Sequence, residues 1–341
     1  MATYTIRLSL RIIMAAAFLF TVGIGDSSSL EFPRFSSIFR QPGKESLQAV
    51  SEKASDEIRE EDRVSEVLNQ NADYRDLFKT LNNPDIQLRQ YVTPGEELKY
   101  QAKWRGLPAG SIHLSAKRLV KLKNRPVFVF ELNVESNDFL SAFYPVSTSI
   151  NSYVDALNGR SYLIRRRVSE RSRDYKDRLE FKYDFRLPNG LPDPVSKYSM
   201  VGENGQEVAS QPFPIPGNMQ DMISIIYYIR GMNLQKVGDS CQLLIGGRKK
   251  PVITSVSVIG EENINVPGFG NFDCLIVEPI TDGTNLSGNL VATRGGERVW
   301  LEKNTLIPVM VTAELPKPLG TVAATLVHAE NSELLKHVKN P

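Results

Sequence analysis

The sequence predicts a mainly β protein. The expected fold is a large antiparallel curved sheet or open β-barrel with one buried helix at about residues 218–230, preceded by a partly helical N-terminal segment. Two observations support this prediction. From residue 91 onward, apolar and polar residues alternate with a period of two in many short runs separated by Gly-, Pro- and Asn-containing turns. Residues 218–230, in contrast, combine helical spacing of apolar residues with start and stop signals.

The size and composition of the chain limit the possible classes of protein. Its 341 residues suffice for one large β domain or two smaller ones. Apolar residues make up 41% and charged residues 23%, which is ordinary for a globular protein. The net charge of +2 implies no overall attraction to nucleic acid or to a membrane.

The first 25 residues have the pattern of a secretory signal peptide. Arg7 and Arg11 precede an uncharged apolar run, Ile12 to Ile24, and small residues stand just before Asp26. The run is short for a bilayer span, which favours cleavage over the alternative of an uncleaved membrane anchor. The mature protein would then contain no integral membrane span and would lie in the periplasm or cell envelope.

Residues 26–90 differ in character from the rest and are predicted to be a linker and weakly helical segment. Between Lys44 and Leu81 the chain is charged, and its apolar residues are scattered. A loosely docked or solvated helix, a disordered tether and a partner-binding helix all fit this composition. The expected β domain covers residues 91–330, and residues 331–341 form a tail.

The first part of the β domain predicts hairpins joined by short turns. Leu98, Tyr100, Ala102 and Trp104 alternate with polar residues, as in a half-buried strand. The segments that follow are a turn at 106–110, a return strand at 112–116, a third strand at 127–134, a helical turn at 138–144, a strand at 146–154 and a turn at 158–159.

The next hairpin is unusual because its first strand, residues 162–172, is polar on both faces, whereas its second, residues 179–185, is amphipathic. The first strand supplies most of a dense basic cluster, and two interpretations stand. The cluster is either a solvated strand paired with nearby acids, or a site for an anionic envelope molecule, since arginine suits phosphate and carboxylate. Nucleic acid is not expected, because acids interleave and the protein is exported. The cluster comprises Arg165, Arg166, Arg167, Arg171 and Arg173.

Residues 218–230 predict the buried helix. Asn218 can cap its start, Arg230 suits its carbonyl end, and Gly231 follows as the stop. Apolar residues cover most of the circumference, so the helix should lie inside or across the curved sheet. Tyr227 and neighbouring methionines either belong to the plain core or line an apolar ligand cavity.

The two cysteines are predicted not to form a disulfide. Residues 241–245, 252–261 and 271–278 read as three successive strands, so the middle strand of a meander separates Cys241 from Cys274. Two strand spacings correspond to about 9–10 Å. A disulfide needs Cα atoms within about 7 Å.

The sequence contains no recognisable catalytic or metal-binding motif. Its three histidines form no HExxH or paired metal spacing, and GxSxG, CxxC and phosphate-loop motifs are lacking. No catalytic residue, metal or cofactor is therefore predicted. The acidic pairs Glu96-Glu97 and Glu261-Glu262 would suit a hydrolase only if carboxylates converged across a cleft.

Several motifs resemble the bacterial exported family known as domain of unknown function 3108. They are GLPAG at 106–110, QDMISIIYYIR at 220–230, VGDSC at 237–241, INVPGFGNFDCLIVEP at 264–279, RVWLEKNTLIPVMV at 298–311 and GTVAATL at 320–326. The resemblance covers about residues 91–328. It implies export and a β fold, and it implies no activity.

The leading functional hypothesis is a non-enzymatic exported cell-envelope protein. It would bind a hydrophobic or anionic envelope molecule, such as a lipid or glycan, or an envelope protein. The alternatives are an envelope hydrolase acting on glycan or lipid, and a structural or assembly factor. The candidate ligand-binding residues are Arg165, Arg167, Arg171, Tyr227, Arg230 and Trp300.

Overall fold

The computed structural model describes residues 83–122, 124–142, 144–170, 173–183, 195–202, 205–209, 213–215, 217–247, 251–284, 290–293, 297–314 and 320–337. The predicted signal peptide, most of the predicted N-terminal segment, and Arg171 lie outside these residues.

Strands dominate the described part of the chain. The helices are η2 (Leu88–Gln90), α4 (Asp138–Ser141), α5 (Ser224–Tyr228), η3 (Ile229–Gly231) and η4 (Glu333–His337). The strands are β1 (Glu96–Trp104), β2 (Leu107–Leu122), β3 (Arg125–Ser136), β4 (Val146–Asp155), β5 (Ser161–Glu170), β6 (Arg173–Lys182), β7 (Val195–Gly202), β8 (Glu207–Ala209), β9 (Phe213–Pro214), β10 (Ser240–Ile245), β11 (Val252–Val266), β12 (Gly270–Thr284), β13 (Leu290–Thr293), β14 (Glu297–Glu302), β15 (Pro308–Glu314) and β16 (Thr321–Glu330).

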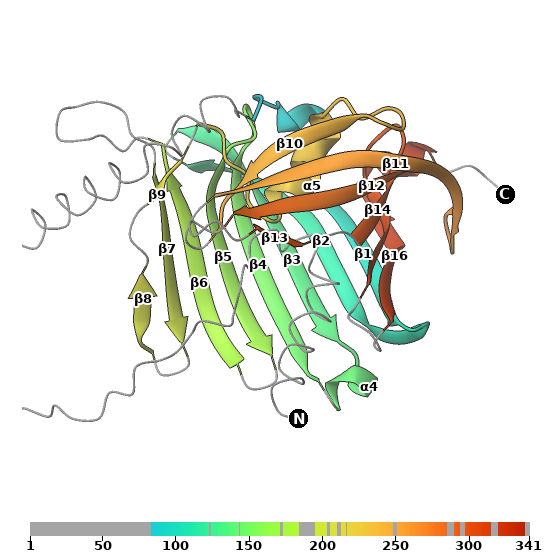
Figure 1. Ribbon diagram of the computed structural model, residues 1–341, viewed down its shortest axis with the longest axis horizontal. Coiled ribbons are helices and arrows are strands. Elements are labelled where there is room, and N and C mark those ends of the chain that lie inside the picture. Colours follow the sequence, from blue (N-terminus) through green and yellow to red (C-terminus); the bar gives the residue numbers. More distant parts are fainter. Residues whose placement is uncertain are drawn as a thin grey trace, which may run out of the picture.

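These strands form one antiparallel sheet of 16 strands that curves around α5 (Figure 1). Its main path runs β10-β11-β12-β14-β15-β16-β1-β2-β3-β4-β5-β6-β7-β8, so β10 and β8 are its two ends and the sheet is not closed. The predicted mainly β fold with a curved sheet is therefore confirmed in its open form. β1 pairs with β16, so the first and last strands in the sequence are neighbours in the middle of the sheet.

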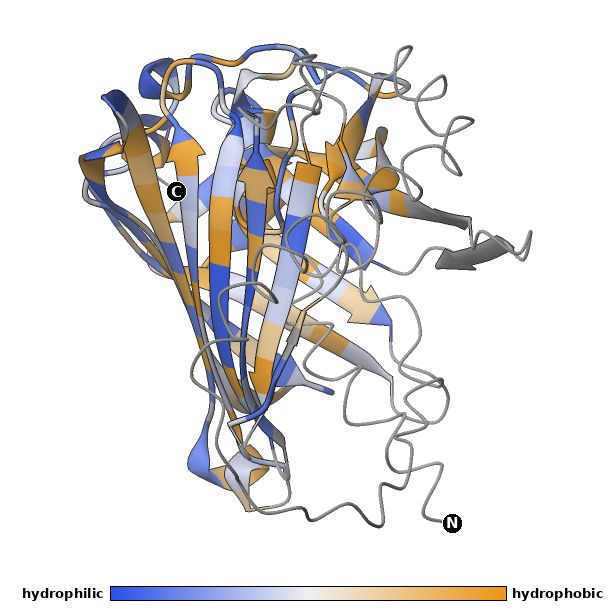
Figure 2. Cartoon of the chain, turned by 90° about the vertical axis from the view of Figure 1, so that its left-hand side faces the viewer, coloured by the Kyte–Doolittle hydropathy of each residue, from blue (hydrophilic) through white to orange (hydrophobic). Residues whose placement is uncertain are grey.

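The core lies between α5 and the concave side of the sheet. Figure 2 shows hydrophobic and hydrophilic residues alternating along the strands, as expected when only one face is buried. The ring of Tyr227 stacks on that of Phe130, with centroids 3.7 Å apart and planes 7° apart. Tyr227, Tyr228 and Met219 are fully buried. The expectation of a helix buried inside the curved sheet is thus confirmed.

The helix is shorter than the sequence predicted. Residues 218–222 instead satisfy their backbone groups with neighbouring segments, since Gln220 N donates to Leu244 O over 3.0 Å and Ser161 N donates to Met219 O over 3.0 Å. Asp221, rather than Asn218, caps the helix by accepting the amides of Ile223 and Ser224. The apolar pattern could not reveal this, because the same side chains are buried in either conformation.

The glycines at 110 and 231 have packing roles that the sequence did not show. A Cβ at Gly231 would collide with the side chain of Ile86, and one at Gly110 would collide with the Glu135 carbonyl. The predicted turn at 106–110 is also tighter than expected. Only Arg105 and Gly106 form it, with φ of 50° and 81°, and β2 begins at Leu107.

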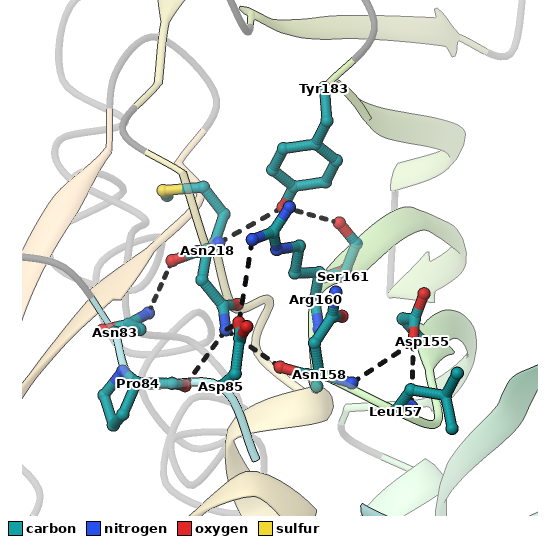
Figure 3. A network of polar contacts seen from close by, with 12 residues as sticks. Asn83, Pro84, Asp85, Asp155, Leu157, Asn158, Arg160, Ser161, Tyr183 and Asn218 are labelled. Atoms are coloured by element: carbon teal, nitrogen blue, oxygen red, sulfur yellow. Dashed lines mark hydrogen bonds and ion pairs between the residues drawn. The ribbon is translucent and has the colours of Figure 1, made fainter. Parts of the chain in front are cut away.

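The segment just before β1 packs closely on the sheet. Leu88 is fully buried. The side-chain amide of Asn83 donates to Asn218 O over 2.9 Å and to Leu244 O over 3.1 Å. Figure 3 shows Asn83 beside Asn218, whose own amide donates to Pro84 O and Asn158 O. Residues 83–90, which the sequence assigned to the N-terminal segment, are therefore integral to the fold.

Both cysteines are free in this structure. Cys241 on β10 lies opposite Val256, and Cys274 on β12 lies opposite Glu262, with β11 between them as predicted. Positions 256 and 262 are six residues apart, or about 20 Å along the strand. The meander therefore separates the two thiols well beyond disulfide distance.

Candidate functional site

The β5–β6 hairpin carries charge on both faces of the sheet. Along β5, Ile164 and Val168 are buried on the concave side, and Arg166 lies between them on that side. Arg165 and Arg167 alternate with these residues and are exposed on the convex side. β5, which the sequence predicted to be polar on both faces, therefore carries charged side chains on both the concave and the convex face of the sheet.

Four cations gather on the outside of this hairpin. Arg165 lies directly opposite Arg178, and Arg167 directly opposite Lys176. All four side chains belong to exposed residues. Like charges in directly opposed positions destabilise a strand pair. We call these four residues the outer basic patch.

The surroundings of the outer basic patch leave most of its charge unneutralised. Arg178 forms an ion pair of 2.5 Å with Glu180. Arg165 lies over the ring of Tyr153, 5.8 Å from its centroid. Within the described part of the chain, Arg165, Arg167 and Lys176 have no ion pair. The neighbouring positions on β4, opposite Arg165 and Arg167, are Asn151 and Ser149, which are neutral.

The inside of the same hairpin is neutralised. Arg166 forms a two-point ion pair with Asp177, through Nε at 2.6 Å and through Nη2. Tyr198 donates its hydroxyl to Asp177 over 3.2 Å, and Arg166 Nη1 lies 3.7 Å from Met222 Sδ. Burial acts to lower the pKa of Arg166, but the adjacent Asp177 carboxylate outweighs it and holds that pKa above its usual value.

Tyr227 and Arg230 lie together in the core rather than beside the arginines of β5. The Arg230 guanidinium lies over the Tyr227 ring, 4.6 Å from its centroid, and pairs with Glu96. Both residues are buried: Tyr227 is 0% exposed and Arg230 is 4% exposed.

Trp300 lies on β14, which several strands separate from β5 in the sheet. It is 8% exposed, and its indole nitrogen donates to Glu262 over 2.8 Å. Arg171 lies outside the described residues. The structure therefore brings together Arg165 with Arg167, and Tyr227 with Arg230, whereas the side-chain hydrogen bond of Trp300 is to Glu262.

The acidic pairs are engaged separately. Glu96 is buried against Arg230, whereas Glu97 faces outward and lies 3.3 Å from His113. Glu261 pairs with Lys303 over 2.8 Å, and Glu262 accepts from Trp300. In the described ranges, no group of three or more His, Cys, Asp or Glu side chains could hold a metal ion.

Sequence reasoning missed Lys176 and Arg178, which complete the outer basic patch. The signal was present in the register. Only residues 171 and 172 separate β5 from β6, so position 170 pairs with 173 and each step back along β5 pairs with a step forward along β6. The predicted return strand began at residue 179, so Lys176 and Arg178 were not recognised as partners of Arg167 and Arg165.

The fold defines a class of mainly β proteins in which one open, curved antiparallel sheet surrounds a short buried helix. The chain belongs to the family described as a protein of unknown function, DUF3108, whose model matches residues 99–327. This confirms the resemblance found in the sequence. A comparison with curated proteins gives no match.

Two solved structures are similar in outline. A β-barrel-like protein of domain of unknown function DUF1849 from Brucella abortus matches with 10% identity and a TM-score of 0.40, covering 70% of this chain and 97% of that chain. A protein from Bacteroides fragilis, described as a putative exported protein with YmcC-like fold, matches with 9% identity and a TM-score of 0.31, covering 70% of this chain and 97% of that chain. At this level of similarity, the two structures support no conclusion about function.

Helices of the described ranges are all too short or too polar to cross a membrane.

Proposed function

We propose that this protein is exported to the cell envelope and binds an anionic envelope molecule, a lipid or glycan bearing phosphate or carboxylate, through the outer basic patch. Export rests on the signal-peptide pattern of residues 1–25. Anion binding rests on one observation. Arg165 faces Arg178 and Arg167 faces Lys176 across the β5–β6 hairpin, on exposed surface.

The energetic argument compares the free and bound states. Each directly opposed like-charge pair costs a few tenths of a kcal/mol up to about 1 kcal/mol in the free protein. Side chains at directly opposed positions have Cβ atoms about 4.5–5.5 Å apart, so one phosphate or carboxylate can contact two cations at once. Guanidinium groups bind such anions through two parallel hydrogen bonds. A bound anion therefore converts a repulsive surface into an attractive one.

Vesicle binding tests this proposal. The mature protein is mixed with vesicles of phosphatidylcholine alone or of phosphatidylcholine with phosphatidylglycerol, and bound protein is measured by flotation at low and high salt. A parallel titration with soluble alginate, an anionic polysaccharide, distinguishes a lipid from a glycan ligand. We expect binding to at least one anionic probe, weakening as salt rises.

The variant Arg165→Gln/Arg167→Gln should lose most of this binding. Arg118→Gln/Lys121→Gln, which removes two exposed cations from β2, is the control of equal net charge. Equal losses in both double variants would show a general charge effect and contradict a specific site. Binding that persists unchanged in Arg165→Gln/Arg167→Gln would also overturn the proposal.

A further inference from the structure

The concave face of the sheet extends beyond the region that α5 covers. Figure 1 shows α5 near one end of strands β2 to β5 and α4 near the other. At the α5 end, Tyr227 stacks on Phe130, and Ser152 Oγ donates to Asp221 over 2.5 Å. Thr148 precedes Ser152 by four residues on β4, so it lies on the same face, nearer to α4.

Burial changes along this face. Phe130 and Ser152, next to α5, are 0% exposed. Thr148 and Val168, which lie opposite each other on β4 and β5, are each 7% exposed. The residues at the α4 end of the concave face therefore keep a small exposed fraction, as do Met222 and Ile225 beside the sheet at the α5 end, each 8% exposed.

Thr148 is the informative residue of this region. Its hydroxyl oxygen is buried and has no hydrogen-bond partner. Leaving a buried hydroxyl unpaired costs about 1–3 kcal/mol, so native structures usually provide a partner. The positions on either side, Val134 on β3 and Val168 on β5, are apolar and cannot provide one.

A second donor stands diagonally across the strands. Arg166 is displaced by two residues from Val168, the residue opposite Thr148, which places Arg166 about 7–8 Å from Thr148. Two of its nitrogens are taken by Asp177. Its third, Nη1, lies 3.7 Å from the weak acceptor Met222 Sδ. This nitrogen can therefore donate to a better acceptor.

We propose that the α4 end of the concave face binds an uncharged amphiphile. An ester or amide carbonyl of the ligand would accept from Thr148 Oγ1 and Arg166 Nη1. Its apolar chain would lie against Val134, Val146 and Val168, all of which are buried on this face.

The charges of the site favour an uncharged ligand. Arg166 is already neutralised by Asp177, so it offers hydrogen bonds without net positive charge. Glu170, the next concave-side residue of β5, is buried and accepts a hydrogen bond from Tyr144. An anionic head group would be desolvated there without a counter-ion and beside a carboxylate, which is costly. This site is separate from the outer basic patch, which lies on the opposite face.

Binding of monooleoylglycerol, oleate and hexadecane to the full mature protein tests the proposal. Native mass spectrometry identifies the bound species, and displacement of a fluorescent neutral amphiphile gives the Kd. We expect monooleoylglycerol to bind more tightly than oleate, which carries a charge, and than hexadecane, which lacks an acceptor.

Thr148→Val removes the hydroxyl and keeps the shape. It should weaken monooleoylglycerol binding by about tenfold, the value of one hydrogen bond. Ser149→Ala, which removes a hydroxyl from the outer face of the same strand, should leave the Kd unchanged, and so should Arg165→Gln/Arg167→Gln. Failure of monooleoylglycerol to bind, tighter binding of oleate, or an unchanged Kd in Thr148→Val would each overturn the proposal.

Discussion

Arg230 and Glu96 form a two-point ion pair inside the core of this protein. Arg230 Nη1 donates to Glu96 Oε2 over 3.0 Å, and Arg230 Nη2 lies 2.8 Å from Glu96 Oε1. Their side chains are 0% and 1% exposed. Ser332 Oγ also donates to Glu96, over 3.1 Å. The pair therefore joins three segments that are distant in sequence: the end of the buried helix, the first strand, and the chain after β16.

Removing one partner of this pair should be strongly destabilising. Glu96→Gln leaves the Arg230 guanidinium buried without a counter-ion, and the expected loss in the free energy of unfolding is about 3–5 kcal/mol. Urea denaturation followed by circular dichroism measures it. The double variant Glu96→Leu/Arg230→Met should lose less than the sum of Glu96→Leu and Arg230→Met, because it leaves no buried charge. If the loss in the double variant equalled the sum of the two single losses, Glu96 and Arg230 would not be coupled as a buried ion pair.

A charge placed in the centre of α5 should unfold the domain. Ile226 is 3% exposed and lies in the middle of the helix. Ile226→Asp loses packing worth about 2–5 kcal/mol and adds a buried carboxylate, against a usual domain stability of about 5–15 kcal/mol. Ile259→Asp is the matched control, since Ile259 is 42% exposed on β11. A melting temperature of Ile226→Asp equal to that of Ile259→Asp would show that α5 is not part of the core.

Asp221 should make stability depend on pH. Burial raises the pKa of Asp221 above its usual value, although hydrogen bonds from Ser152, Ser161, Ser224 and Ile223 act in the opposite direction. The folded state therefore holds a proton more tightly than the unfolded state. Its contribution to stability is present below the ordinary Asp pKa of about 4 and is lost as the pH rises through the raised pKa.

The variant Asp221→Asn isolates this effect, because the amide cannot titrate. The stability of the wild type relative to Asp221→Asn should fall as the pH rises from about 4, the ordinary value of the unfolded chain, toward neutrality. Urea denaturation at a series of pH values measures the difference. A difference that grows in favour of the wild type as the pH rises would show that the hydrogen bonds outweigh burial.

Both thiols should be free and slow to react in the folded protein. Burial raises the pKa of Cys241 to about 11. Burial, followed by the nearby Glu302, raises the pKa of Cys274 to about 12. At pH 8 little reactive thiolate is present. Iodoacetamide without a reductant should therefore modify neither cysteine quickly in native protein and both in urea, as seen by intact mass. An unmodified mass in urea would reveal a disulfide.

Much of the fold could be predicted from the sequence because its signals are local. The alternation of Leu98, Tyr100 and Ala102 marks a half-buried strand wherever that strand lies in the sheet. The apolar circumference of residues 222–229 requires burial on several sides. The order of three strands around Cys241 and Cys274 follows from turn residues alone. A period of two also places Arg165 and Arg167 on the same face of their strand, although the sequence left that strand polar on both faces and did not show which face points outward.

The tertiary structure decided what depends on contacts between distant segments. The sequence could not show that Glu96 faces Arg230 or that Asn83 bonds to Leu244, because each pair is joined only when the sheet curves. It could not set the start of α5 at Ser224, since Asp221 and the edge of β10 compete with the helix for the same backbone groups. Thr148 had no sequence signal, because a hydroxyl is informative only once its neighbours are known to be apolar. The periodicity of the sequence determines on which face of a strand or helix a side chain lies. Only tertiary packing determines which residues that face contacts.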